Sequence, residues 1–319
     1  MSVDRFISGD WGTSRLRLRL VQREPFRILE TIESERGIAA VYDGWEFSGN
    51  SRENYFEGIV GEALEGFEEL VVGLPVAVSG MASSTIGWCE LPYAPLPHQL
   101  TDPLASKVVG ADLDVRLVSG LRWETRDVMR GEESQVVGVW GNPTLNLPSR
   151  FRLILPGTHS KHVLIEDDTI TAFQTFLTGD LFQALGRYSI LKHSVEMRTE
   201  VVANDAFRDG VRRSQTDPMD HVLFSLRCAD LFNIREAAEN AAFLSGLLIG
   251  SEMSALAEGA ETVVVAETAL GKLYAAALHI LGESARLVLI AETALDESVA
   301  RSHARLFGSS SQSCSQAQR

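Results

Sequence analysis

The chain has 319 residues, of which 45% are hydrophobic and 23% charged, and a chain of this length is expected to form about two domains. Asp and Glu number 43 against 29 Lys and Arg, so the net charge is −14. A surface this acidic repels phosphate backbones and anionic lipids, which argues against a nucleic acid or a membrane as partner. A small anionic ligand is not excluded, because a pocket can hold a few cations.

The sequence lacks the features of an exported or membrane protein. Residues 1–10 contain an early acid and no long apolar run, and the longest apolar stretch, 241–250, is too short to cross a bilayer. The three cysteines are far apart and show no paired spacing, which favours reduced thiols. We therefore expect a soluble, cytoplasmic protein.

The first predicted element is a strand–turn–strand unit. Residues 5–8 lead into the turn Gly9-Asp10-Trp11-Gly12-Thr13-Ser14, after which residues 15–20 alternate arginine with leucine. This period of two is typical of a strand buried on one face. A helix is predicted over roughly 53–70, followed by a buried strand over 71–79 that ends at Gly80.

A second strand–turn–strand unit starts near residue 150. The apolar run 151–155 enters the turn Pro156-Gly157-Thr158-His159-Ser160-Lys161, and residues 162–165 form the return strand. The Pro- and Asn-containing stretch 141–149 is predicted to be a linker. Because the two units lie about half a chain apart, we expect two similarly folded domains that face a cleft.

Helical and strand patterns fill the rest of the chain. Residues 235–258 read as a helix whose Gly246 and Gly250, one turn apart, form a face that can pack closely. Two apolar strands near 263 and 287 each lead into a helix, and the Ser- and Gln-rich tail 308–319 is predicted to be disordered.

The two turns carry residue types that phosphoryl transfer needs, namely backbone N–H groups and hydroxyls around phosphates and a carboxylate for magnesium. In the first turn, Gly12, Thr13 and Ser14 are candidate phosphate ligands, and Asp10 is a candidate magnesium ligand, directly or through water. A plain hairpin explains this turn equally well. The second turn repeats glycine and hydroxyls and adds His159 and Lys161, and the repetition favours phosphate binding. No P-loop, Rossmann or hydrolase motif is present.

A third cluster, 129–135, contains the paired acids Glu132 and Glu133 after a glycine. One of them could act as a base and the other as a magnesium-shell ligand. The alternative is that both are ordinary acids at the start of a helix, where the helix dipole favours them. Thr178-Gly179-Asp180 has the same two interpretations, a site or a helix cap.

Taken in order, several stretches of this chain resemble the 2-keto-3-deoxygalactonate kinases (2-dehydro-3-deoxygalactonokinases), a family of the actin-like ATPase and sugar-kinase superfamily. The matching stretches span most of residues 1–295: 10–14 with Leu16 and Arg17, 79–81 with 87–88, 91–93, 129–133 with Gln135, 155–161, 178–182 and 243–250.

The resemblance implies an α/β fold of two ribonuclease H-like (actin-like ATPase) domains, with mixed β-sheets flanked by helices around a central cleft. Residues 1–148 would form the sugar-acid side, residues 149–307 the nucleotide side, and residues 308–319 a disordered tail. The implied activity is transfer of the γ-phosphate of ATP, with Mg²⁺, to the C6 hydroxyl of 2-dehydro-3-deoxy-D-galactonate in galactonate catabolism. A homodimer is left open.

The resemblance also implies a set of site residues. The catalytic candidates are Asp10, Glu132 and Glu133. The nucleotide and phosphate candidates are Gly12, Thr13, Ser14, Gly157, Thr158, His159, Ser160, Lys161 and Glu267. The substrate candidates are Gly80, Met81, Ser84, Trp88 and Arg130, and Arg17, Arg36 or Arg130 could pair with the substrate carboxylate.

The chain departs from the family on the nucleotide side. Glu267 stands where the family usually has glycine, Ala291-Glu292 where it commonly has Gly-Asp, and Ser298 near another usual glycine. Glu267 would repel a phosphate but could accept ribose hydroxyls. These departures motivate an alternative function, a nucleotide-impaired paralogue that binds a ligand without catalysis. A chaperone or filament protein is disfavoured, because the chain is short for a chaperone with a peptide-binding domain.

Overall fold

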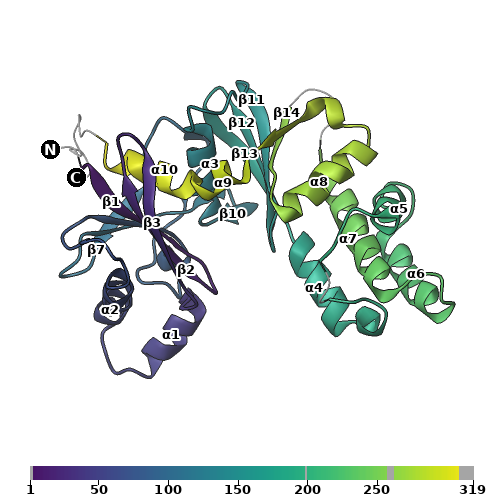
Figure 1. Cartoon of the computed structure of the whole chain (residues 1–319), viewed down its shortest axis with the longest axis horizontal. Helices are drawn as coiled ribbons and strands as arrows, with labels where there is room; N and C mark the ends of the chain where they lie inside the picture. The colour runs from purple at the N-terminus through teal and green to yellow at the C-terminus, as the bar shows by residue number, and fades with distance from the viewer. Residues whose placement is uncertain (1–2, 198–199, 257–261, 309–319) are drawn as a thin grey trace. The chain divides into compact units, whose positions relative to one another are not determined.

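The computed structural model describes residues 3–197, 200–256 and 262–308, and the chain divides into two compact units (Figure 1). Unit 1 comprises Met1–Asn146 together with Thr293–Arg319, and unit 2 comprises Leu147–Glu292. Among the described residues, no helix combines the length and the apolar character that a membrane span requires.

Unit 1 is built on a mixed sheet with the strand order β3-β2-β1-β4-β8-β7. Strands β1, β4 and β8 run parallel, whereas β2, β3 and β7 run antiparallel to their neighbours. The bounds are β1 Arg5–Trp11, β2 Leu16–Gln22, β3 Arg27–Ser34, β4 Val76–Gly80, β7 Ser106–Val109 and β8 Val115–Val118.

Unit 1 also contains helices, which pack on this sheet, and several short strands. The helices of unit 1 are α1 Ile38–Glu46, α2 Arg52–Leu64, α3 Glu132–Trp140, α10 Ser298–Leu306 and the 3₁₀ turn η1 Met81–Ser83, with α9 Glu292–Asp296 at the boundary. The short strands are β5 Ala94–Pro95, β6 His98–Gln99, β9 Leu121–Trp123 and β10 Asp127–Met129, of which β10, β9 and β5 form a small sheet.

Helix α10 corrects the predicted domain boundary, because residues 293–308 pack in unit 1 although the sequence placed residues 149–307 in one domain. Figure 1 shows the yellow α10 beside the purple β1. Phe307 packs on Phe6 with ring centroids 5.1 Å apart, and the buried His303 lies 2.9 Å from Ser8 Oγ and 2.5 Å from Ser79 Oγ. The end of the chain therefore completes the first core.

Unit 2 repeats the strand order of unit 1. Its sheet runs β15-β14-β11-β12-β13, matching β8-β4-β1-β2-β3, with β11, β14 and β15 parallel and β12 and β13 antiparallel. The repeated strand–turn–strand device and the two α/β units with mixed sheets that the sequence predicts are confirmed. The bounds are β11 Arg150–Leu155, β12 Ser160–Glu166, β13 Thr169–Phe176, β14 Thr262–Ala266 and β15 Leu287–Ile290.

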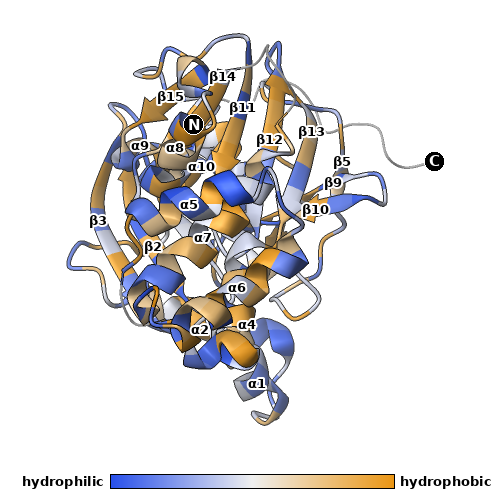
Figure 2. Cartoon of the chain, turned by 90° about the vertical axis from the view of Figure 1, so that its right-hand side faces the viewer, coloured by the Kyte–Doolittle hydropathy of each residue, from blue (hydrophilic) through white to orange (hydrophobic). Residues whose placement is uncertain are grey.

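The helices of unit 2 pack around the buried α7. Both α5 and α6 contact α7, and hydropathy colouring shows a largely hydrophilic surface on α5 (Figure 2). A Cβ on Gly246 would lie 2.1 Å from the Phe207 carbonyl oxygen of α5, so the predicted close-packing glycine face is confirmed. The bounds are α4 Thr178–Tyr188, η2 Ile190–His193, α5 Asp205–Arg213, α6 Met219–Leu231, α7 Ala237–Met253, α8 Ala269–Ile280 and η3 Ser284–Arg286.

Candidate active site

The first predicted turn connects β1 to β2 in unit 1. The Gly12 N–H donates to the Arg15 carbonyl over 2.9 Å, and the carbonyls of Gly12 and Thr13 accept the N–H groups of Ile38 and Ala39 at the start of α1. The side chains of Thr13 and Ser14 are exposed, so their hydroxyls face solvent rather than the fold. The turn is thus anchored through its backbone and presents its side chains outward.

Asp10, Gly80 and Gly131 meet at the ends of their strands. β1 and β4 are parallel, with Asp10 beside Ser79 and Trp11 beside Gly80. Gly80 has φ +91°, and a Cβ there would lie 2.7 Å from the Trp11 carbonyl oxygen and 3.6 Å from Asp10 Oδ1. A Cβ on Gly131, which has φ +109°, would lie 3.3 Å from Gly80 Cα. A side chain at position 80 would therefore meet the Trp11 backbone and touch the Asp10 carboxylate, and one at position 131 would press on Gly80.

The paired acids that follow Gly131 differ in exposure. Glu133 is 0% exposed, and its Oε2 accepts the Gly131 N–H over 2.7 Å. Burial, and next the charge of Glu132, raise the pKa of Glu133 to about 8. Glu132 is half-buried, and its Oε2 accepts the Arg130 N–H over 3.1 Å.

Asp10 shares its surroundings with two arginines and Glu132. Burial raises the pKa of Asp10, the charges of Arg19 and Arg17 lower it, and the charge of Glu132 raises it. Arg19 was missed by the sequence analysis. It is 5% exposed, and its Nη1 has no hydrogen-bond partner among the described residues. The alternation of Arg15, Arg17 and Arg19 was the available signal, but it resembles a solvent-facing pattern.

The loop of residues 80–88, which contains most of the predicted substrate residues, is held by Arg130. Nη1 of Arg130 donates to the carbonyl and to Oγ of Ser83, both over 2.5 Å, Nη2 donates to the Leu91 carbonyl, and Nε donates to the Tyr93 hydroxyl. The guanidinium also lies 4.1 Å from the centroid of the Tyr93 ring. Four of its five N–H donors are thus used within unit 1.

The other predicted substrate residues lie in this loop with different exposure. Met81 is half-buried, and its carbonyl accepts the hydroxyl of the buried Ser84 over 2.7 Å. Trp88 is buried in the core of unit 1, and its indole N–H has no partner among the described residues. The remaining carboxylate candidates are ion-paired, Arg17 with Glu33 at 2.7 Å and Arg36 with Glu62.

The second predicted turn lies in unit 2 against the start of α4. A Cβ on Gly179 would lie 2.6 Å from the Gly157 carbonyl oxygen and 2.7 Å from Thr158 Cα, so only glycine allows this approach. The Asp180 N–H donates to the Thr158 carbonyl over 3.0 Å. This contact places the N-terminus of α4 beside the turn.

The remaining residues of the second turn point in different directions. Thr158 and His159 are exposed, whereas Ser160 and Lys161 are buried. Ser160 Oγ donates to Glu252 over 2.6 Å, and Lys161 Nζ lies 3.5 Å from the His159 carbonyl oxygen. Because successive strand residues face opposite sides of a sheet, Lys161 and Ser160 leave the strand on opposite faces.

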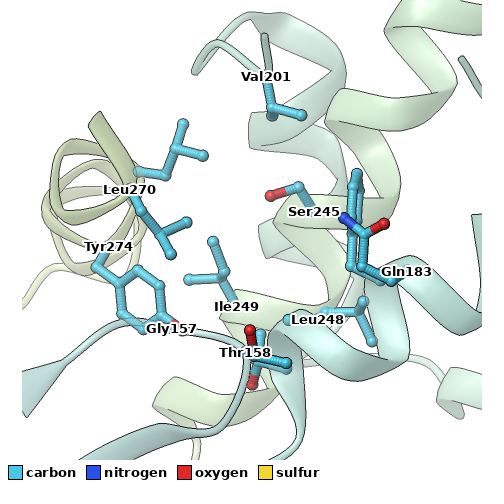
Figure 3. A pocket seen from close by; sticks show the side chains of 13 residues that line it. Gly157, Thr158, Gln183, Val201, Ser245, Leu248, Ile249, Leu270 and Tyr274 are labelled. Atoms are coloured by element: carbon cyan, nitrogen blue, oxygen red, sulfur yellow. The ribbon is translucent and has the colours of Figure 1, made fainter. Parts of the chain in front are cut away.

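A pocket of about 270 Å³ opens beside this turn, within unit 2. Gly157 and Thr158 form one border, and mostly apolar side chains of α4, α7 and α8 form the walls. Figure 3 shows Leu270 and Tyr274 on one side and Ser245, Leu248 and Ile249 on the other, directed into the same space. A pocket of this type, apolar with a few polar groups at one edge, is typical of small-ligand sites.

Glu267 lies outside the residues that line this pocket. Its side chain is exposed, and its N–H donates to the Ile290 carbonyl over 2.9 Å in the connection from β14 to α8. Within the described ranges, no three or more His, Cys, Asp and Glu side chains are grouped to hold a metal ion.

Comparison with known proteins gives consistent matches along the chain. A family model described as 2-keto-3-deoxy-galactonokinase matches residues 10–300. A protein of Rhizobium meliloti (strain 1021) named "Probable 2-dehydro-3-deoxygalactonokinase" is 34% identical over 292 residues, which cover 84% of this chain and 87% of that protein. The 2-dehydro-3-deoxygalactonokinase of Escherichia coli (strain K12) is 28% identical over 256 residues, covering 79% and 80%.

A solved structure matches as well. The crystal structure of a Sinorhizobium meliloti protein, provisionally described as a 2-dehydro-3-deoxygalactonokinase, superposes with a TM-score of 0.82 at 30% identity. The superposition covers 95% of this chain and 99% of that one.

Proposed function

The chain belongs to the 2-keto-3-deoxy-galactonokinase family, and we propose that it transfers the γ-phosphoryl group of ATP to the C6 hydroxyl of 2-dehydro-3-deoxy-D-galactonate. The enzyme class, a sugar-acid kinase, follows from the family. The individual roles given below to the residues of the two units are part of the proposal, as is a place in galactonate catabolism within the cytoplasm.

The observation that carries the proposal is the pocket of unit 2 beside the second turn. Its apolar walls suit a flat, largely apolar base, and its border at Gly157 and Thr158 suits the phosphate end of the same ligand. Backbone N–H groups at the start of α4 would add to the binding of anionic oxygens there. The pocket thus offers both chemistries that a nucleotide requires.

In unit 1, Asp10 and Glu132 form the acidic part of the site. Glu132 is the better candidate for the base, because Glu133 is fully buried and its pKa of about 8 keeps it largely protonated at neutral pH. In the reaction, the C6 oxygen forms a bond to the γ-phosphorus while the bond from phosphorus to the bridging oxygen of ADP breaks. Glu132 accepts the proton of the C6 hydroxyl.

The donor set of unit 1 fits a magnesium ion brought in with ATP. Mg²⁺ is usually held by one or two carboxylates together with substrate phosphates and water, so a complete protein cage is not needed. Asp10 would hold the ion, directly or through water. The bound ion would neutralise charge on the phosphates.

The nucleotide-impaired alternative predicts that ATP does not bind. Glu267 is the residue that motivated it most directly, and this residue is exposed and lies outside the pocket lining. A ligand that binds only the native state raises the melting temperature by mass action. We expect ATP with Mg²⁺ to raise the melting temperature, and no shift at millimolar ATP would favour the alternative.

The product identifies the reaction. After incubation with ATP, Mg²⁺ and the 2-keto-3-deoxy acid, we expect phosphorus NMR to show one new phosphomonoester coupled to the C6 methylene protons. ADP should form in equal amount. A phosphate on another carbon would contradict the assigned position, and ADP formed without any new ester would contradict the transfer itself.

A further inference from the structure

Glu252, near the end of α7, is a buried carboxylate surrounded by hydrogen-bond donors. It is 3% exposed. Its Oε1 accepts Ser160 Oγ over 2.6 Å and lies 2.8 Å from His162 Nε2. Its Oε2 accepts the hydroxyl of Tyr274 over 2.7 Å and that of Thr178.

These four donors come from three different parts of unit 2. Ser160 and His162 lie on β12 directly after the second turn, Thr178 is the first residue of α4, and Tyr274 lies on α8. Glu252 itself is on α7. One carboxylate therefore connects the turn to all three helices whose side chains form the pocket walls.

The donors that these hydrogen bonds bring to Glu252 are three hydroxyls and an imidazole, not a lysine or an arginine. Nδ1 of the buried His162 has no partner among the described residues, which fits the tautomer that carries its proton on Nε2 and donates it to Glu252. Burial and the charge of Glu252 raise the pKa of the Tyr274 phenol, so its hydroxyl keeps its proton and donates a hydrogen bond to Glu252. A buried carboxylate is costly unless such bonds satisfy it.

The cluster lies directly behind the pocket. Thr178 lines the pocket, as does Tyr274 (Figure 3), and Ser160 follows the turn that borders it. Cores are usually filled with apolar side chains, which are at least as stabilising as a buried charge. A buried charge at this place therefore favours a geometric role over a purely stabilising one.

We propose that Glu252 is a positioning residue for the nucleotide: it fixes the second turn, the start of α4 and the Tyr274 wall in the arrangement that binds ATP. The inference rests on the proposed function for the identity of the ligand. Glu252 does not itself line the pocket, so it acts through Ser160, Thr178 and Tyr274.

The direct test is Glu252→Gln, which keeps the shape of the side chain but replaces one acceptor oxygen by an NH₂ group. Two of the donors then lose their acceptor. We expect the Kd for ATP–Mg²⁺, measured by titration calorimetry, to rise roughly ten- to hundredfold, as is common when a buried polar partner is lost. In kinetic assays the KM for the sugar acid should stay within about twofold, since its predicted residues lie in unit 1.

Asn240→Ala is the matched control on the same helix. Asn240 is also fully buried and donates to the carbonyls of Ser194 and Leu226, which lie outside the pocket lining. Its loss should lower the melting temperature but leave the Kd for ATP–Mg²⁺ within about threefold. Equal weakening of ATP binding in both variants would overturn the proposal, because it would reduce Glu252 to a stabilising residue.

Tyr274→Phe provides a second variant in case Glu252→Gln does not fold. It removes one donor and keeps the ring, and we expect a three- to tenfold weaker Kd for ATP–Mg²⁺. A Kd within twofold of wild type in the variant that folds would overturn the proposal. Wild-type protein that binds ATP–Mg²⁺ without turnover would contradict the kinase function instead, and the binding measurements on Glu252 would still decide its role.

Discussion

Glu132 and Glu133 are adjacent in sequence but have different environments. Both follow Gly131 at the start of α3, where negative charge is favoured by the helix dipole. Glu133 points into the core of unit 1, whereas Glu132 stays half-buried and close enough to Asp10 to raise its pKa. These environments support Glu132 over Glu133 as the proposed base, and the catalytic role of either acid stays a prediction.

Exchanging each acid for its amide separates the two roles. We expect Glu132→Gln to lower kcat by about 10²- to 10⁴-fold, the usual contribution of a general base. Glu133→Gln should keep kcat within about tenfold at pH 7, because the amide oxygen can still accept the Gly131 N–H. Steady-state kinetics with saturating ATP measures both. The reverse order of effects would reassign the base to Glu133.

The pKa of Glu133 also predicts how the stability of unit 1 depends on pH. The pKa is raised from 4.5 to about 8, so between these values the folded state binds a proton that the unfolded state releases. The free energy of unfolding should therefore fall as the pH rises through this window, by at most roughly 1.4 kcal/mol per pH unit. Glu133→Gln cannot ionise and should lose this slope.

Urea unfolding at pH 5.5 and pH 8, followed by tryptophan fluorescence, measures the effect. All five tryptophans, Trp11, Trp45, Trp88, Trp123 and Trp140, belong to unit 1. Identical pH dependence in wild type and Glu133→Gln would show that the side chain is ionised in the folded protein.

At the scale of single elements, local pattern predicted the type of element well and its limits less well. The helix predicted over 53–70 is α2, which ends at Leu64, and the strand predicted from Val71 begins only at Val76. Gly73 has φ +78° and turns the chain between them, which an extended strand does not allow. Apolar residues 71–74 fit a strand pattern, but this backbone geometry overrides it.

Helix α10 gives the element-scale prediction. Phe307, just after this helix, is 4% exposed and packs on Phe6 of β1. We expect Phe307→Ala to destabilise unit 1 by about 3 kcal/mol, as for other buried aromatic truncations, with a matching shift of the tryptophan transition. Phe224→Ala, at a side chain 54% exposed in unit 2, is the control. An unchanged tryptophan transition in Phe307→Ala would contradict the assignment of the C-terminal segment to unit 1.

At the scale of the whole molecule, the sequence predicted the repeated strand–turn–strand device, because period-two strands and glycine turns are local features. It could not predict the hydrogen bond from Ser160 to Glu252, because these residues are far apart in the sequence. It also missed that the buried Arg19 lowers the pKa of Asp10, because an arginine that alternates with leucine is expected on the solvent face of a strand. That the two domains face a cleft stays a prediction.

The measurement that tests the central claim most directly is ADP release by the purified chain, coupled to NADH oxidation, with ATP, Mg²⁺ and 2-dehydro-3-deoxy-D-galactonate. We expect turnover that requires both the sugar acid and Mg²⁺. The Asp10→Asn variant should stay folded and show a turnover rate lower by at least about a hundredfold. Absence of turnover by the wild type with any six-carbon 2-keto-3-deoxy acid would contradict the account.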